Sequence, residues 1–342
     1  MADTTTSVLT AYLRSLYGQD ALKALTQKGQ FWRAGSTNGH TVTERTGANG
    51  KARGSAVIFD IYTAGTVSTA ALGENTDGTA VSLATSQKTV TLVEHGAYTH
   101  TTRKLHETSY ADIEAQSAWQ MGDLANRTMD TLARDALDAE TGATWVGYGS
   151  GGTTDAGSVA TITKGNDLTA DDVRKAWSKL KGKNVEPMDD GYYWAYIHPD
   201  VIKDLKDETG DSSWVKAIQY SNLADPLAPL RDEAGLFEGF RFIVTTNAKL
   251  QSKAGNGTTT SAASADVYTT YFIGKEALGF GYYNDSGNPV EIIVGQPLAA
   301  GGNDAYERFQ TIAWYSLCGF SAIRADALYK VYSASSLGAN GA

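Results

Sequence analysis

The sequence predicts an α+β fold organised around one long helix and one long β-hairpin. Apolar residues recur at spacings of three and four between residues 109 and 141, as they do on one face of a helix. Thr-, Val- and Ile-rich segments separated by turn dipeptides fill residues 41–98, as in paired strands. The 36 glycines against 6 prolines indicate many turns, and 42% apolar residues suffice for a core. We therefore expect a loop-rich, strand-rich body.

The helix over residues 109–141 is the clearest expected element. Ser109 and Asp112 form an approximate capping box at its start, and Gly142 follows its last periodic turn as a C-cap. A helix of this length runs about 45 Å, which predicts a spine that crosses the whole domain. Its periodic apolar residues are Ala118, Met121, Ala125, Met129, Leu132 and Ala136.

Residues 41–98 predict long β-hairpins, because Asn49-Gly50 and Asp77-Gly78 supply the positive φ angles of tight turns. Residues 63–88 are mostly Thr, Ala, Gly and Ser, so the hairpin cannot bury itself and is expected to be an arm that seeks a partner. Its charges would either keep the loop solvated or set its register against a neighbouring chain, and both readings stay open. These charged residues are Glu44, Arg45, Lys51, Arg53, Glu74 and Asp77.

The other expected elements are shorter. Residues 7–32 predict helical pieces on an N-terminal arm, and residues 142–166 an exposed loop. A second helix over 168–181 is expected to present Val173, Trp177 and Leu180 on one face. The remaining expected elements are a buried strand at 192–197, a short helix from Pro199 to near Leu205, strands at 240–245, 267–273 and 290–294, a flexible segment at 251–265, and an aromatic run over 306–333 that returns extended.

Charge and cysteine content limit the classes of function. The net charge of −9 and pI near 5.1 disfavour tight nucleic-acid binding, although an acidic wall could lie near DNA without adhering to it. Cys318 is alone, so no intramolecular disulfide forms, and its apolar neighbours predict a buried, inert thiol. Neither a signal peptide nor a membrane span is recognisable, so we expect a soluble chain that is not exported.

A glycine pattern and a group of histidines could carry chemistry, and each favours a structural reading. Gly147, Gly149 and Gly152 match the glycines of a dinucleotide-binding turn, but a helix precedes them and a loop follows, whereas that turn needs a strand before it and a helix opening within it. Three histidines are the only ones close together in the sequence, and imidazole is a common metal ligand. On an extended strand their spacing would place the first on the face opposite the second and the second far from the third, so no metal site forms. They are His95, His100 and His106.

The sequence also contains no recognisable nucleophile for covalent catalysis. No serine lies in a Gly-x-Ser-x-Gly elbow, and burial of Cys318 would raise the pKa of its thiol. The carboxylate pairs Asp171 with Asp172 and Asp189 with Asp190 lie at helix starts or turns, where capping explains them. The sequence therefore predicts no enzyme, no catalytic, cofactor-binding or metal-binding residues, and no cofactor.

The order of the elements resembles that of tailed-bacteriophage major capsid proteins, and specifically the family typified by phage N-four. The matching stretches, in chain order, are Ala71-Leu72-Gly73-Glu74-Asn75, Thr89-Val90-Thr91-Leu92-Val93-Glu94-His95-Gly96, Leu124-Ala125 to Asp130 with Asp135, Ile197-His198-Pro199-Asp200 to Asp204-Leu205, Trp214, Glu238-Gly239-Phe240-Arg241-Phe242-Ile243, Tyr271-Phe272-Ile273-Gly274-Lys275-Glu276-Ala277, and Ala325-Asp326-Ala327-Leu328-Tyr329. The resemblance spans residues 30–333.

The resemblance implies a Hong Kong-type capsid fold and a shell subunit that packs into hexamers and pentamers around double-stranded DNA, assembled in the host cytoplasm and carried in the virion. It implies no membrane, and as partners it implies the portal and decoration proteins. We also expect a separate scaffolding protein, because the roughly 40 residues that precede the hairpin are too few for a scaffolding segment. The implied division is 1–40 N-terminal arm, 41–98 extended hairpin loop, 99–190 peripheral domain with spine helix 109–141, 191–295 axial domain, and 296–342 return to the peripheral domain and tail.

Three other classes stay open on the sequence. An encapsulin-like compartment would share the fold but enclose cargo enzymes instead of a genome. A β-rich surface binding module would explain the Gly and Thr content, although it calls for a secretion signal. An enzyme would need a bound cofactor or metal to supply its chemistry.

Overall fold

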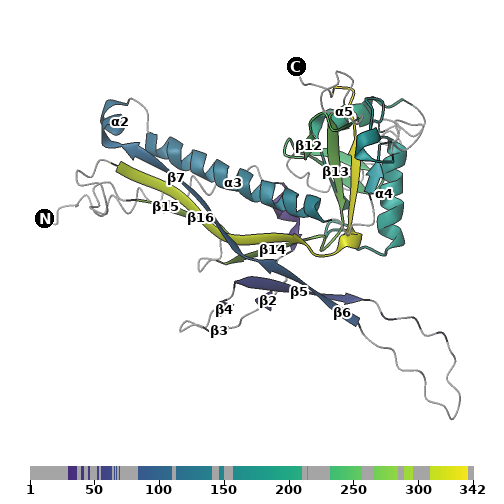
Figure 1. The fold of residues 1–342 in the computed structure, drawn as a ribbon, viewed down its shortest axis with the longest axis horizontal. Helices are drawn as coiled ribbons and strands as arrows, with labels where there is room; N and C mark the ends of the chain where they lie inside the picture. The colour runs from purple at the N-terminus through teal and green to yellow at the C-terminus, as the bar shows by residue number, and fades with distance from the viewer. Residues whose placement is uncertain are drawn as a thin grey trace, which may run out of the picture.

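A computed structural model describes residues 30–36, 40–41, 45–46, 52–53, 55–63, 65, 67, 69, 84–109, 113–140, 146–149, 157–209, 214, 232–255, 265–283, 289–295 and 309–337. The molecule is elongated: one long helix runs beside a sheet on the left of Figure 1, a more compact domain lies at the right, and a hairpin projects below. Among the described residues, no helix combines the length and apolarity needed to cross a membrane.

Two sheets form most of the body. The five-stranded sheet consists of β1 (Gly35–Ser36), β14 (Leu278–Tyr283), β16 (Phe309–Ala322), β15 (Glu291–Val294) and β7 (Val93–Thr102). The seven-stranded sheet consists of β10 (Glu233–Phe237), β11 (Phe240–Val244), β9 (Tyr193–Ile197), β13 (Val267–Ile273), β17 (Leu328–Ser333), β8 (Val146–Tyr148) and β12 (Leu250–Gln251).

Smaller sheets and the helices complete the described fold. The hairpin sheet consists of β2 (His40–Thr41), β5 (Ala56–Thr63) and β6 (Ala84–Thr91), and β3 (Arg45–Thr46) pairs with β4 (Ala52–Arg53). The helices are α2 (Arg103–Thr108), α3 (Ile113–Ala139), α4 (Ala170–Gly182) and α5 (Pro199–Asp207), with 3-10 turns η1 (Phe31–Ala34), η2 (Val159–Thr161) and η4 (Ala325–Ala327).

The predicted spine helix is present as α3, which spans 27 residues and is therefore about 40 Å long. Its buried side chains recur at three and four, and most are small, so the helix lies close to the sheet. They pack on the face of β16 that carries Ile312, Trp314 and Cys318. The buried apolar and small residues of α3 are Ala118, Gly122, Ala125, Met129, Ala133 and Leu137.

The seven-stranded sheet holds the main core. Every residue of β13 is buried, because α3, α4, α5 and neighbouring strands enclose it. The strands predicted at 192–197, 240–245, 267–273 and 290–294 are observed as β9, β11, β13 and β15, and the short helix that begins at Pro199 is α5. Its core is mostly aromatic: Tyr193, Tyr196, Phe240, Phe242, Tyr271 and Phe272.

Two local predictions are wrong. Residues 142–166 are not all an exposed loop, since β8 pairs in parallel with β17 and the Ile162 side chain is fully buried. The predicted face of the second helix does not include Trp177, which is 42% exposed, because its ring lies beside Gly239 instead of in the core. The buried positions of α4 are Val173, Ala176 and Leu180, with spacings of three and four.

The strand pairing also crosses the predicted domain boundaries. β7 includes residues 93–98 of the predicted hairpin loop, yet it pairs along its whole length with β16. β14 and β15 lie within the predicted axial range but join the same five-stranded sheet. The extended return over 306–333 is two strands, β16 and β17, which lie in different sheets because η4 separates them. The division into domains stays a prediction.

Several expectations concern residues outside the described part of the chain. These are the helical pieces before residue 30, the cap residues Asp112 and Gly142, and the turns at Asn49-Gly50 and Asp77-Gly78.

The end of the described chain is held by carboxylates of the compact domain. Asp204 accepts hydrogen bonds from Ser335 Oγ at 2.6 Å and from the Ser336 amide at 2.7 Å. Asp167 forms a parallel bridge with Ala334, and its Oδ1 has no hydrogen-bond donor in the described structure. Burial, with the charge of Asp204 adding to it, raises the pKa of Asp167 to about 6.

This pKa predicts a pH-dependent penalty. Because the folded pKa lies above the unfolded value, ionised Asp167 destabilises the fold, so stability falls as pH rises from about 4 to above 6. Asp167→Asn should raise the free energy of unfolding at pH 7.5 by about 1–2 kcal/mol, a figure reduced for partial solvent screening. At pH 4 the gain should vanish. Urea unfolding at both pH values measures it, with the exposed Asp207→Asn as control; equal effects of Asp167→Asn at both values would contradict this prediction.

Candidate functional site

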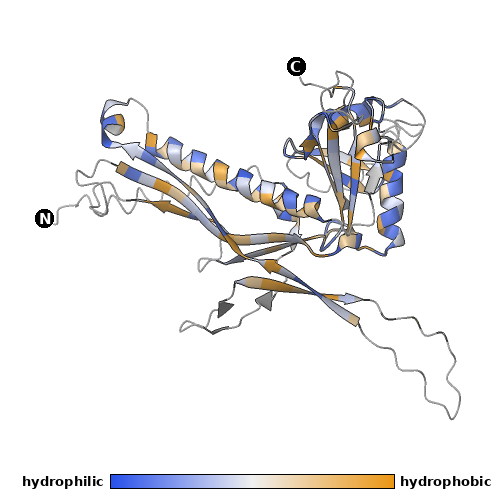
Figure 2. Ribbon diagram, viewed as in Figure 1, coloured by the Kyte–Doolittle hydropathy of each residue, from blue (hydrophilic) through white to orange (hydrophobic). Residues whose placement is uncertain are grey.

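The root of the hairpin is anchored on the five-stranded sheet. β5 and β6 pair antiparallel from Ala56 with Thr91 to Thr63 with Ala84. Side chains at every second position face the body, where Val57, Phe59 and Val90 are buried with Leu92 and Ile323. The root of the hairpin therefore buries an apolar face against the body, and Figure 2 shows apolar residues along β5 and β6. The expectation that residues 63–88 lack a core of their own concerns mostly residues outside the described part of the chain.

Glycines make room for this root. A Cβ on Gly319 of β16 would lie 2.2 Å from the Thr91 carbonyl oxygen, and one on Gly281 of β14 would lie 2.9 Å from Val57 Cγ2. These two glycines are directly paired across β14 and β16. The backbone of the hairpin thus approaches the sheet where side chains are absent.

The other face of the hairpin points away from the body. It carries Ile58, Asp60 and Tyr62 from β5, paired with Thr89, Gln87 and Thr85 of β6. Tyr62 is 76% exposed, and Gln87 Nε2 donates a hydrogen bond of 2.8 Å to Asp60 Oδ1. The hairpin therefore presents an aromatic ring next to a carboxylate.

The five-stranded sheet is covered unevenly. α3 covers one face, and the hairpin root covers the Leu317 end of the opposite face. The remainder of that opposite face carries Tyr98, which is 68% exposed, together with Ile293 at 47% and Phe309 at 44%. His100 lies between two of these rings, with its centroid 5.0 Å from Tyr98 and 5.9 Å from Phe309. Clustered exposed apolar side chains of this kind mark interaction surfaces.

A groove of about 380 Å³ lies at the far end of this sheet, beside α2. Its lining residues are Thr102, Arg103, Lys104, Glu107 and Phe309. Arg103 Nε pairs with Glu107 Oε1 at 2.8 Å, whereas Lys104 makes no ion pair with any described residue. The groove therefore combines an aromatic wall with a net positive charge.

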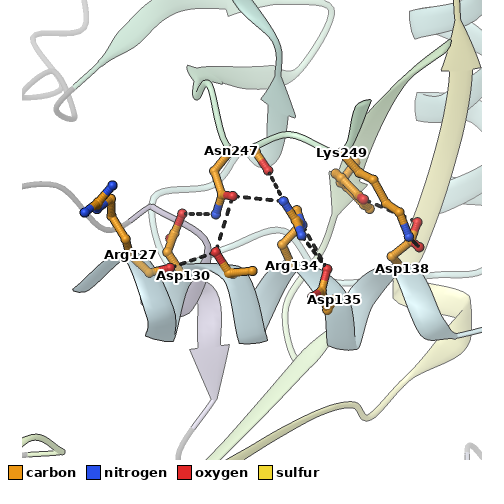
Figure 3. A network of polar contacts seen from close by, with 9 residues as sticks. Arg127, Asp130, Arg134, Asp135, Asp138, Asn247 and Lys249 are labelled. Carbon is orange, nitrogen blue, oxygen red and sulfur yellow. Dashed lines mark hydrogen bonds and ion pairs between the residues drawn. The ribbon is translucent and has the colours of Figure 1, made fainter. Parts of the chain in front are cut away.

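A polar joint links α3 to the seven-stranded domain. Asp130, Arg134 and Asp138 lie four residues apart on one stripe of α3 and face the segment that contains Asn247 and Lys249 (Figure 3). Asn247 Nδ2 donates to Asp130 Oδ2 at 2.8 Å, and Arg134 Nη1 donates to Asn247 Oδ1 at 2.9 Å. Lys249 pairs with Asp138. These contacts fix the angle between the helix and the domain.

The segment that begins at Gln30 passes through this joint. The amides of Gln30 and Phe31 donate to Asp130 Oδ1 at 2.7 and 2.6 Å, and Tyr196 Oη donates to the Gln30 carbonyl at 2.9 Å. Burial raises the pKa of Asp130, while Asn247 and the two amides act in the opposite direction. The carboxylate thus joins three segments of the chain.

The end of α3 is capped from the seven-stranded sheet. Lys330 on β17, 3% exposed, donates from Nζ to the carbonyls of Asp138 at 2.8 Å and Glu140 at 2.9 Å. A cation here satisfies the last carbonyls of the helix and favours its dipole. Burial lowers the pKa of Lys330.

The structure places two of the three histidines on β7 and the third on α2. His95 and His100 pair with Ser316 and Thr311 on β16 and lie on opposite faces of β7, which confirms that part of the prediction. His106 is not on the strand as predicted, because the strand ends at Thr102 and α2 follows. Within the described ranges, no group of three or more His, Cys, Asp or Glu residues could hold a metal ion.

The described residues of the glycine pattern and the lone cysteine lie in or beside strands. Gly147 lies in β8, so a short strand, not only a helix, precedes Gly149, and Gly152 lies outside the described residues. Cys318 is buried, its Sγ lies 3.4 Å from Met129 Sδ, and burial raises the pKa of the thiol as expected. The prediction that no residue is catalytic or binds a cofactor stays a prediction.

The acidic pairs also match their predicted structural reading. Asp172 completes a capping box with Thr169 at the start of α4. Asp190 accepts a hydrogen bond from the Tyr192 amide in a turn and pairs with Arg241 at 2.7 Å. Burial raises the pKa of Asp190 but its hydrogen bonds lower it further, so the net shift is downward and the group stays ionised.

Sequence reasoning missed the groove and the joint. The groove needs the turn of α2, and α2 has only six residues, too short for a clear helical period. Asp130 and Asp138 are charged residues on an amphipathic helix, which usually face solvent. For Asp130 the only signal was its place within the stretch that resembles the capsid proteins.

Comparison with known proteins identifies the family. The family model described as phage capsid protein matches residues 141–329, more than half of the chain. No curated protein sequence gives a significant match.

Solved structures with the same fold come from several phages. The capsid of Ralstonia phage GP4 is 14% identical, with a TM-score of 0.66 and coverage of 86% of each chain. The capsid of cyanophage Pam1 is 14% identical, with a TM-score of 0.60 over 84% of this chain and 87% of the other. The head structure of Helicobacter pylori bacteriophage KHP40 is 13% identical, with a TM-score of 0.57 over 81% and 85%.

These likenesses establish the predicted capsid fold, and the matched family model establishes the family. The elongated body, spine helix and projecting hairpin are consistent with it. The chain therefore belongs to the phage capsid protein family, whose members are structural proteins of the head shell and not enzymes.

Proposed function

We propose that this major capsid protein assembles into hexamers and pentamers of itself, which close into an icosahedral shell around double-stranded DNA. One observation carries the proposal: the chain presents an outward hairpin face and an open apolar sheet face on a single elongated subunit. Isolated surfaces of this kind are costly in a monomer and become favourable when neighbouring copies cover them. Many modest interfaces then stabilise a closed shell.

The acidic composition supports a container more than a DNA-binding protein. With a net charge of −9, the chain lacks the excess of cations that neutralises phosphates in tight complexes. DNA would be enclosed without sequence-specific contacts. The proposed setting is the host cytoplasm for assembly and the virion for the finished shell.

Electron microscopy of the purified protein over a range of salt concentrations tests this proposal. We expect rings, tubes or closed shells at high protein concentration, and nuclease-protected double-stranded DNA in shells from infected cells. A strictly monomeric particle under every condition, with and without partner proteins, would contradict self-assembly. A protein cargo in place of DNA would favour the encapsulin-like alternative.

We also propose that the chain belongs to the branch typified by phage N-four. The stretch Ile197-His198-Pro199-Asp200 supports this, because each residue has a defined place: Ile197 ends β9, His198 Nδ1 accepts the Asp200 amide at 3.2 Å, and Pro199 opens α5. A solved capsid protein of that branch should show the same histidine cap. A different residue or geometry there would count against the assignment.

A scaffolding protein, a portal and decoration proteins are the proposed partners. Their contribution is measurable by co-expression: a scaffolding protein should narrow the size distribution of the shells, and a decoration protein should raise their thermal stability. Unchanged shells in the presence of each candidate would exclude that candidate.

A further inference from the structure

A short strap, Ala334–Leu337, follows the last strand of the seven-stranded sheet and contacts the loop before α4 and one side of α5. The Ala334 amide donates to the Asn166 carbonyl at 2.9 Å, and Ala334 and Ser335 are each only 1% exposed. Leu337 is 48% exposed, and its amide donates to Ser335 Oγ at 3.3 Å. Hydrogen bonds therefore contribute much of the attachment of the strap.

Two carboxylates from different elements flank this strap. Asp204 of α5, whose side chain is 8% exposed, accepts hydrogen bonds from Ser335 Oγ at 2.6 Å and from the Ser336 amide at 2.7 Å. Asp167, in the loop before α4, forms a parallel bridge with Ala334, and its buried Oδ1 receives no hydrogen bond from the described part of the chain. The strap thus satisfies one carboxylate, whereas the other is desolvated beside it.

The two carboxylates respond to protons in opposite directions. Burial, with the charge of Asp204 adding to it and that of Lys203 opposing it, raises the pKa of Asp167 to about 6. Burial also raises the pKa of Asp204, but the hydrogen bonds from Ser335 and Ser336 outweigh it, so the net shift is downward. Lifting the strap would hydrate both groups and return each pKa toward its ordinary value of 3.8. A proton on Asp167 therefore favours the closed strap, whereas a proton on Asp204 opposes it.

We propose that Asp167 and Asp204 form a proton-sensitive clasp, which holds the strap more tightly in mild acid than at neutral pH. At about pH 7.5 Asp167 is ionised and desolvated near a second anion, so opening of the strap relieves an unfavourable charge. At about pH 5 Asp167 is neutral while Asp204 is still an ionised acceptor, so the strap is closed more firmly. Opening would expose Ala334 and Ser335.

This clasp is separate from the surfaces proposed for self-assembly. In Figure 1, α5 lies at the top of the compact domain, whereas the hairpin strands β5 and β6 lie below the body. All contacts of the clasp lie within one chain. The inference therefore does not rest on the proposed function.

One neighbouring group has a similar pH range. His198, at the start of α5, lies with its ring centroid 4.8 Å from that of Tyr268 and its Nδ1 3.3 Å from Asp200 Oδ2. Burial lowers the pKa of His198 while Asp200 raises it, so this imidazole also changes charge in mild acid. The other charged or titratable groups on the elements around the clasp are Lys164, Asp172, Asp200, Lys203, Asp207, Glu208, Asp266 and Tyr268.

Hydrogen exchange of the Ala334, Ser336 and Leu337 amides measures the opening of the strap, because each donates a hydrogen bond when the strap is closed. Each rate is divided by the intrinsic rate of an unstructured chain at the same pH, which gives a protection factor. In the unassembled full chain, these protection factors should be about three- to tenfold higher at pH 5 than at pH 7.5. Equal protection at the two pH values would overturn the clasp.

Two variants assign the response to the carboxylates. Asp167→Asn carries no charge at either pH, so at pH 7.5 its strap should reach the protection that the wild type shows at pH 5, and the pH dependence should disappear. Asp204→Asn weakens the charge-assisted hydrogen bonds to the strap, so protection should fall about tenfold at both pH values. A wild-type pH dependence in Asp167→Asn, or wild-type protection in Asp204→Asn, contradicts the proposal.

Two further variants are controls. His198→Asn keeps a side chain that can cap α5 and should keep the wild-type pH dependence. If that dependence is lost in His198→Asn but kept in Asp167→Asn, the response belongs to the imidazole. Asp189→Asn removes a charge that is 92% exposed in the turn before β9, whereas α5 follows the end of β9. An effect of Asp189→Asn equal to that of Asp167→Asn would show a general effect of net charge and no clasp.

The urea dependence of exchange separates local opening from the global stability effect of Asp167. Local opening exposes little surface, so a low concentration of urea should leave exchange of the strap nearly unchanged while it accelerates exchange of the β13 amides. If the strap amides follow urea as steeply as those of β13, the penalty on Asp167 is relieved only by global unfolding. That result would overturn the clasp.

Discussion

Gly319→Ala is expected to displace the hairpin root from the five-stranded sheet while leaving the seven-stranded domain folded. The added Cβ would lie 2.2 Å from the Thr91 carbonyl oxygen and 2.9 Å from Val90 Cγ1. The nearest atom belongs to the backbone, so no side-chain rotation relieves the clash and the root of the hairpin must move away. The buried Val57, Phe59 and Val90 then lose their contacts with the sheet. Shell assembly should fall by at least about tenfold in the concentration required.

Hydrogen exchange and limited proteolysis measure this effect directly. β5 and β6 should exchange faster in Gly319→Ala, whereas β9 and β13 should keep the wild-type protection. Gly165→Ala is the matched control, because a Cβ there meets no atom within 4 Å and should change neither property. Wild-type protection of the hairpin in Gly319→Ala would show that its backbone is not held against this glycine.

Phe31→Ala is expected to produce the largest loss of stability, about 3–5 kcal/mol in the free energy of unfolding. The Phe31 ring is fully buried, with ring centroids 4.4 Å from Tyr196 and 5.5 Å from Tyr271. Its removal leaves a cavity in the main core. It also weakens the segment whose amides bind Asp130, so the joint between α3 and the seven-stranded domain should loosen.

Urea unfolding of the unassembled protein measures the loss, and hydrogen exchange at residues 130–139 measures the loosening of the joint. Phe31→Leu keeps most of the volume and should lose less. Phe309→Ala removes a ring that is 44% exposed and should cost less than about 1 kcal/mol. Similar losses for Phe31→Ala and Phe309→Ala would mean that Phe31 does not connect the two parts of the molecule.

Elements with a strong local signal were predictable from the sequence. α3 has a helical apolar period over seven turns, and β13 is a continuous run of β-branched and aromatic residues, so both were expected close to their observed bounds. β14 was not predicted because Gly279 and Gly281 interrupt a strand of only six residues. These glycines are explained only by the hairpin and Ile323, which pack on them from elsewhere in the chain.

The candidate surfaces were predictable in part. Turn dipeptides and the poor core of residues 63–88 predicted the arm, and the resemblance predicted that copies pack together. The residues of the groove, the open sheet face and the joint could not be predicted, because each combines segments far apart in the sequence. Asp130 contacts residues 30, 31 and 247, and no local pattern records such contacts.

The pairing of β7 with β16 has a consequence for synthesis of the chain. Thr102 pairs with Phe309 and Val93 with Cys318, so more than 200 residues separate the partners and the order of pairing is antiparallel. Contacts of such separation form late, since a long loop must close before they add stability. On the ribosome, β7 and the sheet face of α3 therefore stay unpaired until β16, more than 200 residues further along the chain, has been made. A nascent or truncated chain that lacks β16 also lacks the surface on which its hairpin packs, so only chains that include β16 would be competent to join a growing shell.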